Sequence, residues 1–290
     1  MDQAQQLRNV IIVKNQNNVG NARVVTVTSG KGGVGKSNVS VNLAVSLSKA
    51  GKKVIIFDAE FGLANVEVMF GAIPQYNLSD LIYQGKSIRE IITPGPMGIG
   101  FISGGSGIIG LNNLNREQIM YLVKSINELN DMADFIIIDT GAGISDQVLE
   151  FVLASPEIIL VTTPEPSSFT DSYSLMKALF KNPSFNPDSS SIQLVANKVL
   201  SREDGYAVYE KLNSVIQQFL HGKLNYLGYI PSDIAIEKAV RQQKTVSLND
   251  PNSKSAKQFE LIAAKLLNEE ANVSKRGLTQ IISNLFTRKG

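Results

Sequence analysis

The chain has 290 residues, enough for one large α/β domain or two small ones with a sizeable buried core. Apolar residues make up 43% of the sequence and charged residues 19%, which excludes a disordered or fibrous protein, and the formal net charge of +2 gives no general attraction to nucleic acid. The absence of cysteine excludes disulfides, thiolate zinc sites and cysteine-ligated iron–sulfur clusters, and the single histidine, His221, leaves little room for a histidine-based metal site.

The N-terminus does not have the pattern of a signal peptide, because a polar segment precedes an apolar run of only four residues, 10–13. No window reaches about 18 consecutive apolar residues, so a transmembrane helix is not expected. We therefore expect a cytoplasmic protein. Residues 1–22 form a short polar segment and an asparagine-rich linker, and we place them outside the main domain, which we expect to span 23–272.

Continuous apolar runs alternate with helical patterns through the main domain. The candidate strands are 23–28, 53–58, 98–103, 134–139, 157–163, 191–196 and 224–230, and the clearest candidate helices are 38–50, 116–130, 206–220 and 253–270. Continuous runs suit strands that are covered on both faces. The pattern predicts a doubly wound α/β fold, a mostly parallel sheet of about seven or eight strands with helices on both faces. The stretches 93–113 (around the candidate strand 98–103) and 181–190 are predicted to be loops rather than domain boundaries.

A glycine-rich stretch, SGKGGVGKS at 29–37, follows the first strand and precedes the first helix, and it matches the P-loop pattern GxxxxGK[ST] without a mismatch. Glycines let backbone N–H groups turn toward phosphate oxygens, and the helix N-terminus adds its dipole. Lys36 can reach the β- and γ-phosphates, and the Ser37 hydroxyl can ligate Mg²⁺. The expected nucleotide-binding residues of this loop are Gly30, Lys31, Gly32, Gly33, Val34, Gly35, Lys36, Ser37 and Asn38.

Two aspartates end apolar strands near this loop. Asp58 follows VIIF, and Asp139 closes FIIID just before a glycine-rich turn. Ligands of open α/β sheets bind at the carboxyl ends of the strands. Asp139 in this position is typical of a Walker B acid near Mg²⁺, and Gly141 can sense the γ-phosphate as part of a switch.

The C-terminal stretch 273–290 has a different character from the domain before it. Leu278, Ile281, Ile282, Leu285 and Phe286 fall at helical spacing on one face, and basic residues flank them with no acidic residue in the stretch 274–290. A basic amphipathic helix suits reversible binding to an anionic membrane surface. Packing of the same helix against its own domain is the alternative.

An early lysine, Lys31, makes the loop the deviant form KGGVGKS, and here the sequence resembles the MinD/ParA family of P-loop NTPases, which have a deviant Walker A motif and belong to the SIMIBI class. The resemblance implies slow hydrolysis of ATP with Mg²⁺, and a homodimer formed with ATP in which Lys31 reaches the partner's nucleotide. It also implies that Asp58 assists Mg²⁺ and that Glu60, where aspartate is usual, orients the attacking water. The implied base-side residues are Asn197, Lys198, Pro231 and Asp233.

Two further stretches resemble the flagellar branch of that family, the FlhG family (also called YlxH or FleN). The first is DQAxxLR, formed by Asp2, Gln3, Ala4, Leu7 and Arg8, and the second is GLANVEVMFG at 62–71. This resemblance implies that the N-terminal segment stimulates an FlhF-type GTPase. It further implies control of flagellar number or placement, contacts with flagellar switch or C-ring proteins and with a flagellar transcription regulator, and release of the tail to the membrane when ATP drives dimerisation.

Other functions remain open at this stage. A division-site MinD is the nearest alternative, although such proteins usually begin close to the first strand. A ParA-type partition ATPase would bind DNA, which the near-neutral charge and the lipid-type tail do not favour. A metabolic P-loop enzyme or an iron–sulfur carrier is the third, and the carrier would need cysteines that the chain lacks.

Overall fold

The structure, a computed structural model, describes residues 22–60, 65–105 and 116–268. Within these residues one sheet of eight strands has the order β3-β4-β2-β5-β1-β6-β7-β8. The strands are β1 (Arg23–Ser29), β2 (Val54–Ala59), β3 (Thr93–Pro94), β4 (Gly100–Ile102), β5 (Phe135–Ala142), β6 (Glu157–Thr162), β7 (Ser191–Val199) and β8 (Asn225–Pro231). Every pairing is parallel except that of β3 with β4, which confirms the predicted doubly wound, mostly parallel fold.

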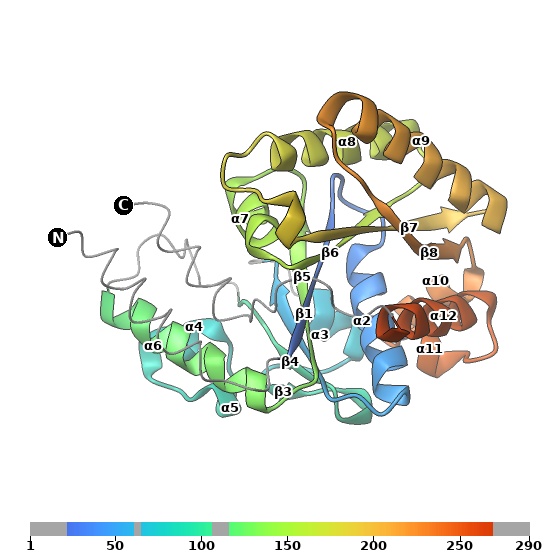
Figure 1. The fold of residues 1–290 in the computed structure, drawn as a ribbon. Coiled ribbons are helices and arrows are strands. Elements are labelled where there is room, and N and C mark those ends of the chain that lie inside the picture. The colour runs from blue at the N-terminus through green and yellow to red at the C-terminus, as the bar shows by residue number, and fades with distance from the viewer. Residues whose placement is uncertain (1–21, 61–64, 106–115, 269–290) are drawn as a thin grey trace.

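Helices cover both faces of the sheet (Figure 1). They are α2 (Lys36–Lys49), α3 (Asn65–Phe70), α4 (Leu78–Gln84), α5 (Ile88–Ile91), α6 (Arg116–Asn127), α7 (Asp146–Ala154), α8 (Pro166–Phe180), α9 (Arg202–Leu220), α10 (Ile234–Arg241), α11 (Val246–Asn249) and α12 (Lys254–Asn268). One face packs against α2 and α12, and the other is shared by α4 to α6 under one half of the sheet and α7 to α9 under the other half.

Alternate residues of each central strand enter opposite cores, because successive side chains of a strand point to opposite faces. In β5, Ile137 packs in the core beneath α2, whereas Ile136 and Ile138 pack in the core beneath α4 to α6. All three side chains are fully buried. Burial on both faces is why these strands read as continuous apolar runs rather than alternating ones.

The stretch 93–113 was expected to be loop around the strand 98–103, and its described part, 93–105, contains one further strand. Thr93 and Pro94 form β3, which pairs antiparallel with β4 at the edge of the sheet. A strand of two residues carries no periodicity, so the sequence gives no signal for it. The helix expected at 206–220 begins earlier, at Arg202, because the Ser201 side chain accepts a hydrogen bond from the Asp204 N–H and caps the first turn.

The register of the central strands brings the two predicted acids together. Asp58 of β2 lies opposite Asp139 of β5 in the parallel ladder, and β5 is in turn the neighbour of β1. The glycine-rich loop leaves the carboxyl end of β1, between β5 and β6. The loop and both acids therefore lie together at the carboxyl ends of the central strands.

At the amino ends of the strands, Arg23 connects the start of the domain to its last helix, α12. The guanidinium donates two hydrogen bonds to the Glu157 carboxylate, at 2.6 and 2.7 Å, and a third to the Leu266 carbonyl of α12 at 2.6 Å. The side chains are 16% and 6% exposed, so this fork-shaped ion pair is largely out of water.

Replacing Arg23 by alanine should lower the free energy of unfolding by about 3 kcal/mol, because it leaves the buried Glu157 carboxylate without a counter-charge. Urea unfolding followed by circular dichroism measures this loss. The double variant Arg23→Met, Glu157→Leu should recover at least half of it, since neither charge is then buried alone. Equal losses in the single and double variants would contradict this account.

Candidate functional site

At two positions of the loop between β1 and α2, neighbouring atoms leave no room for a side chain, so only glycine fits. Gly35 has a φ of +92°, and a Cβ placed there would overlap the Asn197 side chain. A Cβ on Gly30 would overlap the backbone of Asp171 in α8. The loop is therefore packed tightly between β7 and α8.

Asn197 and Lys198, at the carboxyl end of β7, hold this loop from the side. The Asn197 amide donates a hydrogen bond of 2.7 Å to the Val34 carbonyl, and the Lys198 ammonium donates one of 2.9 Å to the Gly33 carbonyl. Lys198 has a φ of +57°, a backbone conformation that non-glycine residues rarely adopt. These contacts brace the loop, and a role beside the nucleotide base stays a prediction.

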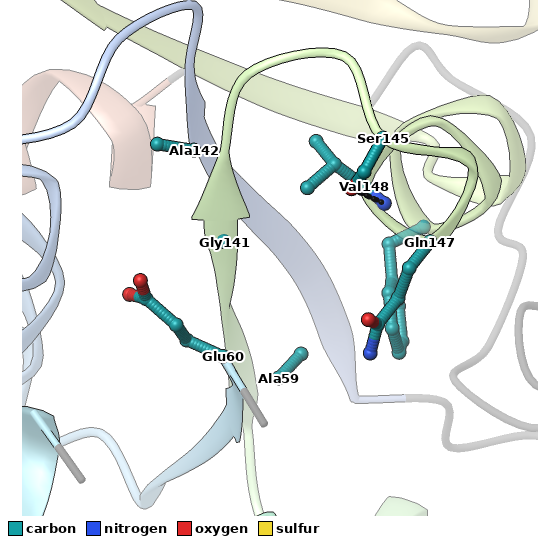
Figure 2. Close-up of a pocket in the computed structure, with 8 residues that line it drawn as sticks. Ala59, Glu60, Gly141, Ala142, Ser145, Gln147 and Val148 are labelled. Carbon is teal, nitrogen blue, oxygen red and sulfur yellow. Dashed lines mark hydrogen bonds between the residues drawn. The ribbon is translucent and has the colours of Figure 1, made fainter. Parts of the chain in front are cut away.

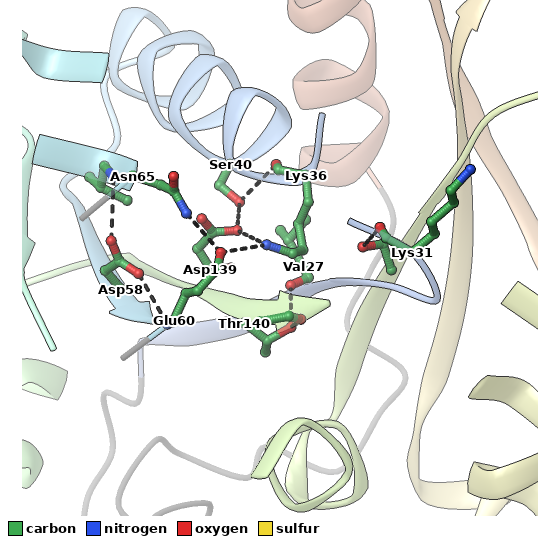
Figure 3. Close-up of polar contacts among 12 residues, drawn as sticks. Val27, Lys31, Lys36, Ser40, Asp58, Glu60, Asn65, Asp139 and Thr140 are labelled. Carbon is green, nitrogen blue, oxygen red and sulfur yellow. Dashed lines mark hydrogen bonds and ion pairs between the residues drawn. The ribbon is translucent and has the colours of Figure 1, made fainter. Parts of the chain in front are cut away.

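Lys36, the first residue of α2, points back into a cluster of acids (Figure 3). Its ammonium lies 3.4 Å from Glu60 Oε2 and 3.6 Å from Asp139 Oδ1, and only 6% of the side chain is exposed. On the same helix, the Ser40 hydroxyl donates a hydrogen bond of 2.9 Å to Asp139 Oδ1. The structure thus brings together three residues that the sequence predicted for one site.

The two strand-end aspartates are held in a way that disfavours their negative charge. Burial, reinforced by the neighbouring Asp139 carboxylate, raises the pKa of Asp58 to about 7, even though the N–H groups of Glu60 and Val66 donate to it. Burial also raises the pKa of Asp139, against the opposing effect of the Lys36 ammonium. The site therefore favours additional positive charge.

The residues present fit a divalent cation of the magnesium type. Asp139 Oδ2 is buried and accepts no hydrogen bond, and Asp58 lies opposite Asp139 in the strand ladder. The buried Ser37 is the next residue after Lys36 in α2. Within the described part of the chain, no three carboxylate or imidazole groups converge as a complete metal site. Mg²⁺ usually takes one or two carboxylates and completes its shell with phosphate and water, which matches this arrangement.

Glu60 lies beside a small cavity at the carboxyl edge of the sheet (Figure 2). The cavity has a volume of about 170 Å³, and Gly141, Ser145 and Gln147 also line it. The Asn65 amide, at the start of α3, donates a hydrogen bond of 2.7 Å to Glu60 Oε2. The predicted water-orienting acid and the predicted switch glycine therefore share one water-accessible space.

Lys31, the early lysine of the loop, is held near the surface of its own chain. Its ammonium lies 2.6 Å from the Ser167 hydroxyl and 3.2 Å from Glu165 Oε2, at the start of α8. The Lys31 side chain is 36% exposed and the Glu165 side chain 60%. An exposed ion pair of this kind contributes roughly 0–1 kcal/mol, so releasing the lysine costs little.

The remaining predicted residues lie farther along the chain. Pro231 ends β8, and the Asp233 carboxylate caps two helices, since it accepts from the Ala235 N–H at 2.9 Å and from the Ser255 N–H at 3.1 Å. Base contacts by these two residues stay predictions.

The N-terminal motif and the apolar residues of the tail lie outside the described residues. No helix of the described part is both long and apolar enough to cross a membrane.

Four residues that contact the predicted ones were not assigned these contacts from the sequence, namely Ser40, Asn65, Glu165 and Ser167. Ser40 follows Lys36 by one helical turn, so helical spacing could have placed it beside Asp139. Asn65 and Glu165 meet their partners through loop geometry, and no pattern in the sequence identifies those contacts.

The chain is similar to several known proteins. The family model named ParA, described as an NUBPL iron-transfer P-loop NTPase, matches residues 20–267. The antiactivator FleN of Pseudomonas aeruginosa is 37% identical over 88% of this chain and 90% of its own length. The flagellum site-determining protein YlxH of Helicobacter pylori is 35% identical over 100% of this chain and 99% of its own. The septum site-determining protein MinD of Pyrococcus horikoshii, solved with Mg-ADP, superposes with a TM-score of 0.66 at 25% identity, over 84% of this chain and 96% of that one.

The raised pKa of Asp58 gives a pH test on the protein without nucleotide or Mg²⁺. Below about pH 4 Asp58 is protonated in both folded and unfolded chains, but up to about pH 7 only the folded chain keeps the proton. The stabilisation linked to this proton is therefore present at low pH and is lost as the pH rises through 7, by up to a few kcal/mol. Urea unfolding at pH 5.0 and 7.5 should give a steeper loss for the natural chain than for Asp58→Asn. Equal losses in the two proteins would show that Asp58 does not titrate in this way.

Proposed function

Because the chain belongs to the MinD/ParA family of P-loop NTPases, and within it to the flagellar group that includes FleN and YlxH, we propose that it is a regulatory ATPase that cycles between a monomer and an ATP-bound dimer. The observation that carries the proposal is the convergence of Lys36, Asp139 and Glu60 beside the glycine-rich loop. This arrangement supplies a cation that can bind phosphate oxygens and a carboxylate that can orient the attacking water.

The reaction is in-line attack of water on the γ-phosphate of ATP. Lys36 stabilises the charge that develops on the phosphate oxygens, and Glu60 orients the water. Ser37, Asp58 and Asp139 would hold Mg²⁺, which neutralises phosphate charge when bound. Aspartate is usual at the position of Glu60 in the family. The longer side chain of Glu60 suits slow hydrolysis, which would set the lifetime of the ATP-bound dimer.

Dimerisation supplies the second lysine. Lys31 leaves Glu165 and Ser167 and reaches the nucleotide of the partner subunit. The low cost of breaking its present contacts supports this movement. ATP binding and dimerisation are then one event, and two C-terminal tails bind an anionic membrane together more strongly than one tail does. The protein is accordingly cytoplasmic, with reversible attachment to the inner face of the cell membrane.

The names of the relatives support a flagellar role. One relative is called an antiactivator and the other a flagellum site-determining protein. We propose that this chain regulates flagellar number or placement. Its partners are an FlhF-type GTPase, which the segment 1–22 stimulates, flagellar switch or C-ring proteins, and a flagellar transcription regulator.

Two other functions of this fold are less well supported. The matching family model is described by iron transfer, but the chain contains no cysteine, and cysteine thiolates are the usual ligands of transferred clusters. A division-site protein remains the second candidate, because MinD of Helicobacter pylori is 29% identical over 92% of this chain. Stimulation of an FlhF-type GTPase separates the two functions.

Lys36→Gln should abolish ATP-driven dimerisation, because it removes the buried cation that faces the phosphates. Light scattering with saturating ATP and Mg²⁺ measures the dimer. Glu60→Ala is the matched control, since it should still dimerise with ATP while hydrolysing it more slowly. Normal dimerisation of Lys36→Gln would contradict the switch.

A synthetic peptide of residues 1–20 should stimulate GTP hydrolysis by an FlhF-type GTPase, as should the full chain. The same peptide with Gln3→Ala should not, because the glutamine is the polar group expected to enter the partner's catalytic site. Phosphate release measures both rates. A peptide and a full chain that are both inactive would favour the division-site function.

A further inference from the structure

We propose that Asn65 is a positioning residue that sets the direction of the Glu60 carboxylate, an inference that rests on the proposed ATPase function. Asn65 is the first residue of α3, and its amide donates to Glu60 Oε2 at 2.7 Å. Figure 3 shows the Glu60 carboxylate between the Asn65 amide and the Lys36 ammonium. Asn65 touches neither phosphate nor water in this scheme and acts only through Glu60.

Two donors contact the same oxygen of Glu60, Oε2. Oε2 receives the short hydrogen bond from Asn65 and the 3.4 Å contact from Lys36. Within the described residues, no hydrogen bond to Oε1 occurs. One oxygen is therefore anchored, and the other receives no hydrogen bond from the described residues, which leaves it to accept one from the attacking water.

The length of the side chain makes this anchor necessary. Glutamate has one more rotatable bond than aspartate, and a carboxylate that swings by about 1 Å can cost roughly 100-fold in rate. Lys36 cannot fix the direction alone, because its ammonium also lies 3.6 Å from Asp139 and is a compact, non-directional charge. The planar amide of Asn65, with a fixed N–H direction, removes this freedom.

The start of α3 also links Asp58 of β2 with Glu60, which directly follows that strand. The Val66 N–H donates to Asp58 Oδ2 at 3.3 Å, while the preceding residue, Asn65, donates to Glu60. A displacement of α3 would therefore move a predicted Mg²⁺ ligand and the water-orienting acid together. This makes α3 the element through which a partner could change the rate of hydrolysis without contacting the nucleotide.

The test is steady-state ATP hydrolysis by the full chain with Mg²⁺ and anionic vesicles. Asn65→Ala should lower kcat by about 10-fold and leave KM for ATP within about 2-fold, because it disorders a group used in the transition state and no group that binds the ground state. In a Glu60→Ala background the same substitution should change kcat by less than about 2-fold. In a Glu60→Asp background it should also have little effect, because the shorter carboxylate withdraws by about one bond length from the amide.

The controls separate positioning from folding. Asn77→Ala is matched in residue type and removes the N-cap of α4, so it should lower the thermal midpoint while kcat is unchanged. If Asn65→Ala does not fold, Asn65→Asp keeps the size of the side chain but cannot donate to Glu60, and it should show the same loss of kcat. Equal effects of the Asn65 substitution with and without Glu60, or a rise in KM with unchanged kcat, would overturn the inference and leave the ATPase intact. No hydrolysis by the natural chain would overturn both the proposed function and this inference.

Discussion

The buried ammonium of Lys36 is the interaction around which the site is built. A buried cation is strongly unfavourable unless carboxylates compensate it, and here Glu60 and Asp139 do so from the ends of two different strands. The compensation works only if β2 and β5 stay in register and if α2 begins directly after the glycine-rich loop. The register of β2 with β5 and the start of α2 must therefore both be right for the lysine and its acids to meet out of water.

The two lysines of the loop differ in a way that follows from their surroundings. Lys36 is enclosed by the sheet and two acids, whereas Lys31 is partly exposed and contacts surface groups at the start of α8. Burial fixes the first in place, because any movement would leave unpaired charges behind. Exposure leaves the second free to exchange its partners at small cost. A single short loop therefore carries one fixed cation and one movable cation.

Much of this could be predicted from the sequence, for reasons that particular residues make clear. The apolar run FIIID predicted both a buried strand and a polar group at its carboxyl end, and Asp139 lies there. The P-loop pattern predicted a glycine-dependent turn before α2, and Gly35 has a φ of +92°, because backbone conformation is local information. The close approaches of Asp171 to Gly30 and of Asn197 to Gly35 join distant parts of the chain and were not predicted. The contacts of Lys31 with Glu165 and Ser167 could not be predicted, since they join residues far apart in the chain across loops of irregular shape. The same holds for Asn65, whose position depends on how the chain turns after β2.

The contacts of Arg23 have a consequence for the connectivity of the domain. One guanidinium binds both the first strand's neighbour, through Glu157, and the last turn of α12, through the Leu266 carbonyl. The start and the end of the described domain therefore lie within the reach of a single side chain, at the end of β1 remote from the glycine-rich loop. The two ends of the described domain are therefore close enough in space to be joined by a short linker. A circular permutant joined at this point and opened in the loop between α8 and β7 would change the order of the strands along the chain while every nucleotide-site residue kept its neighbours.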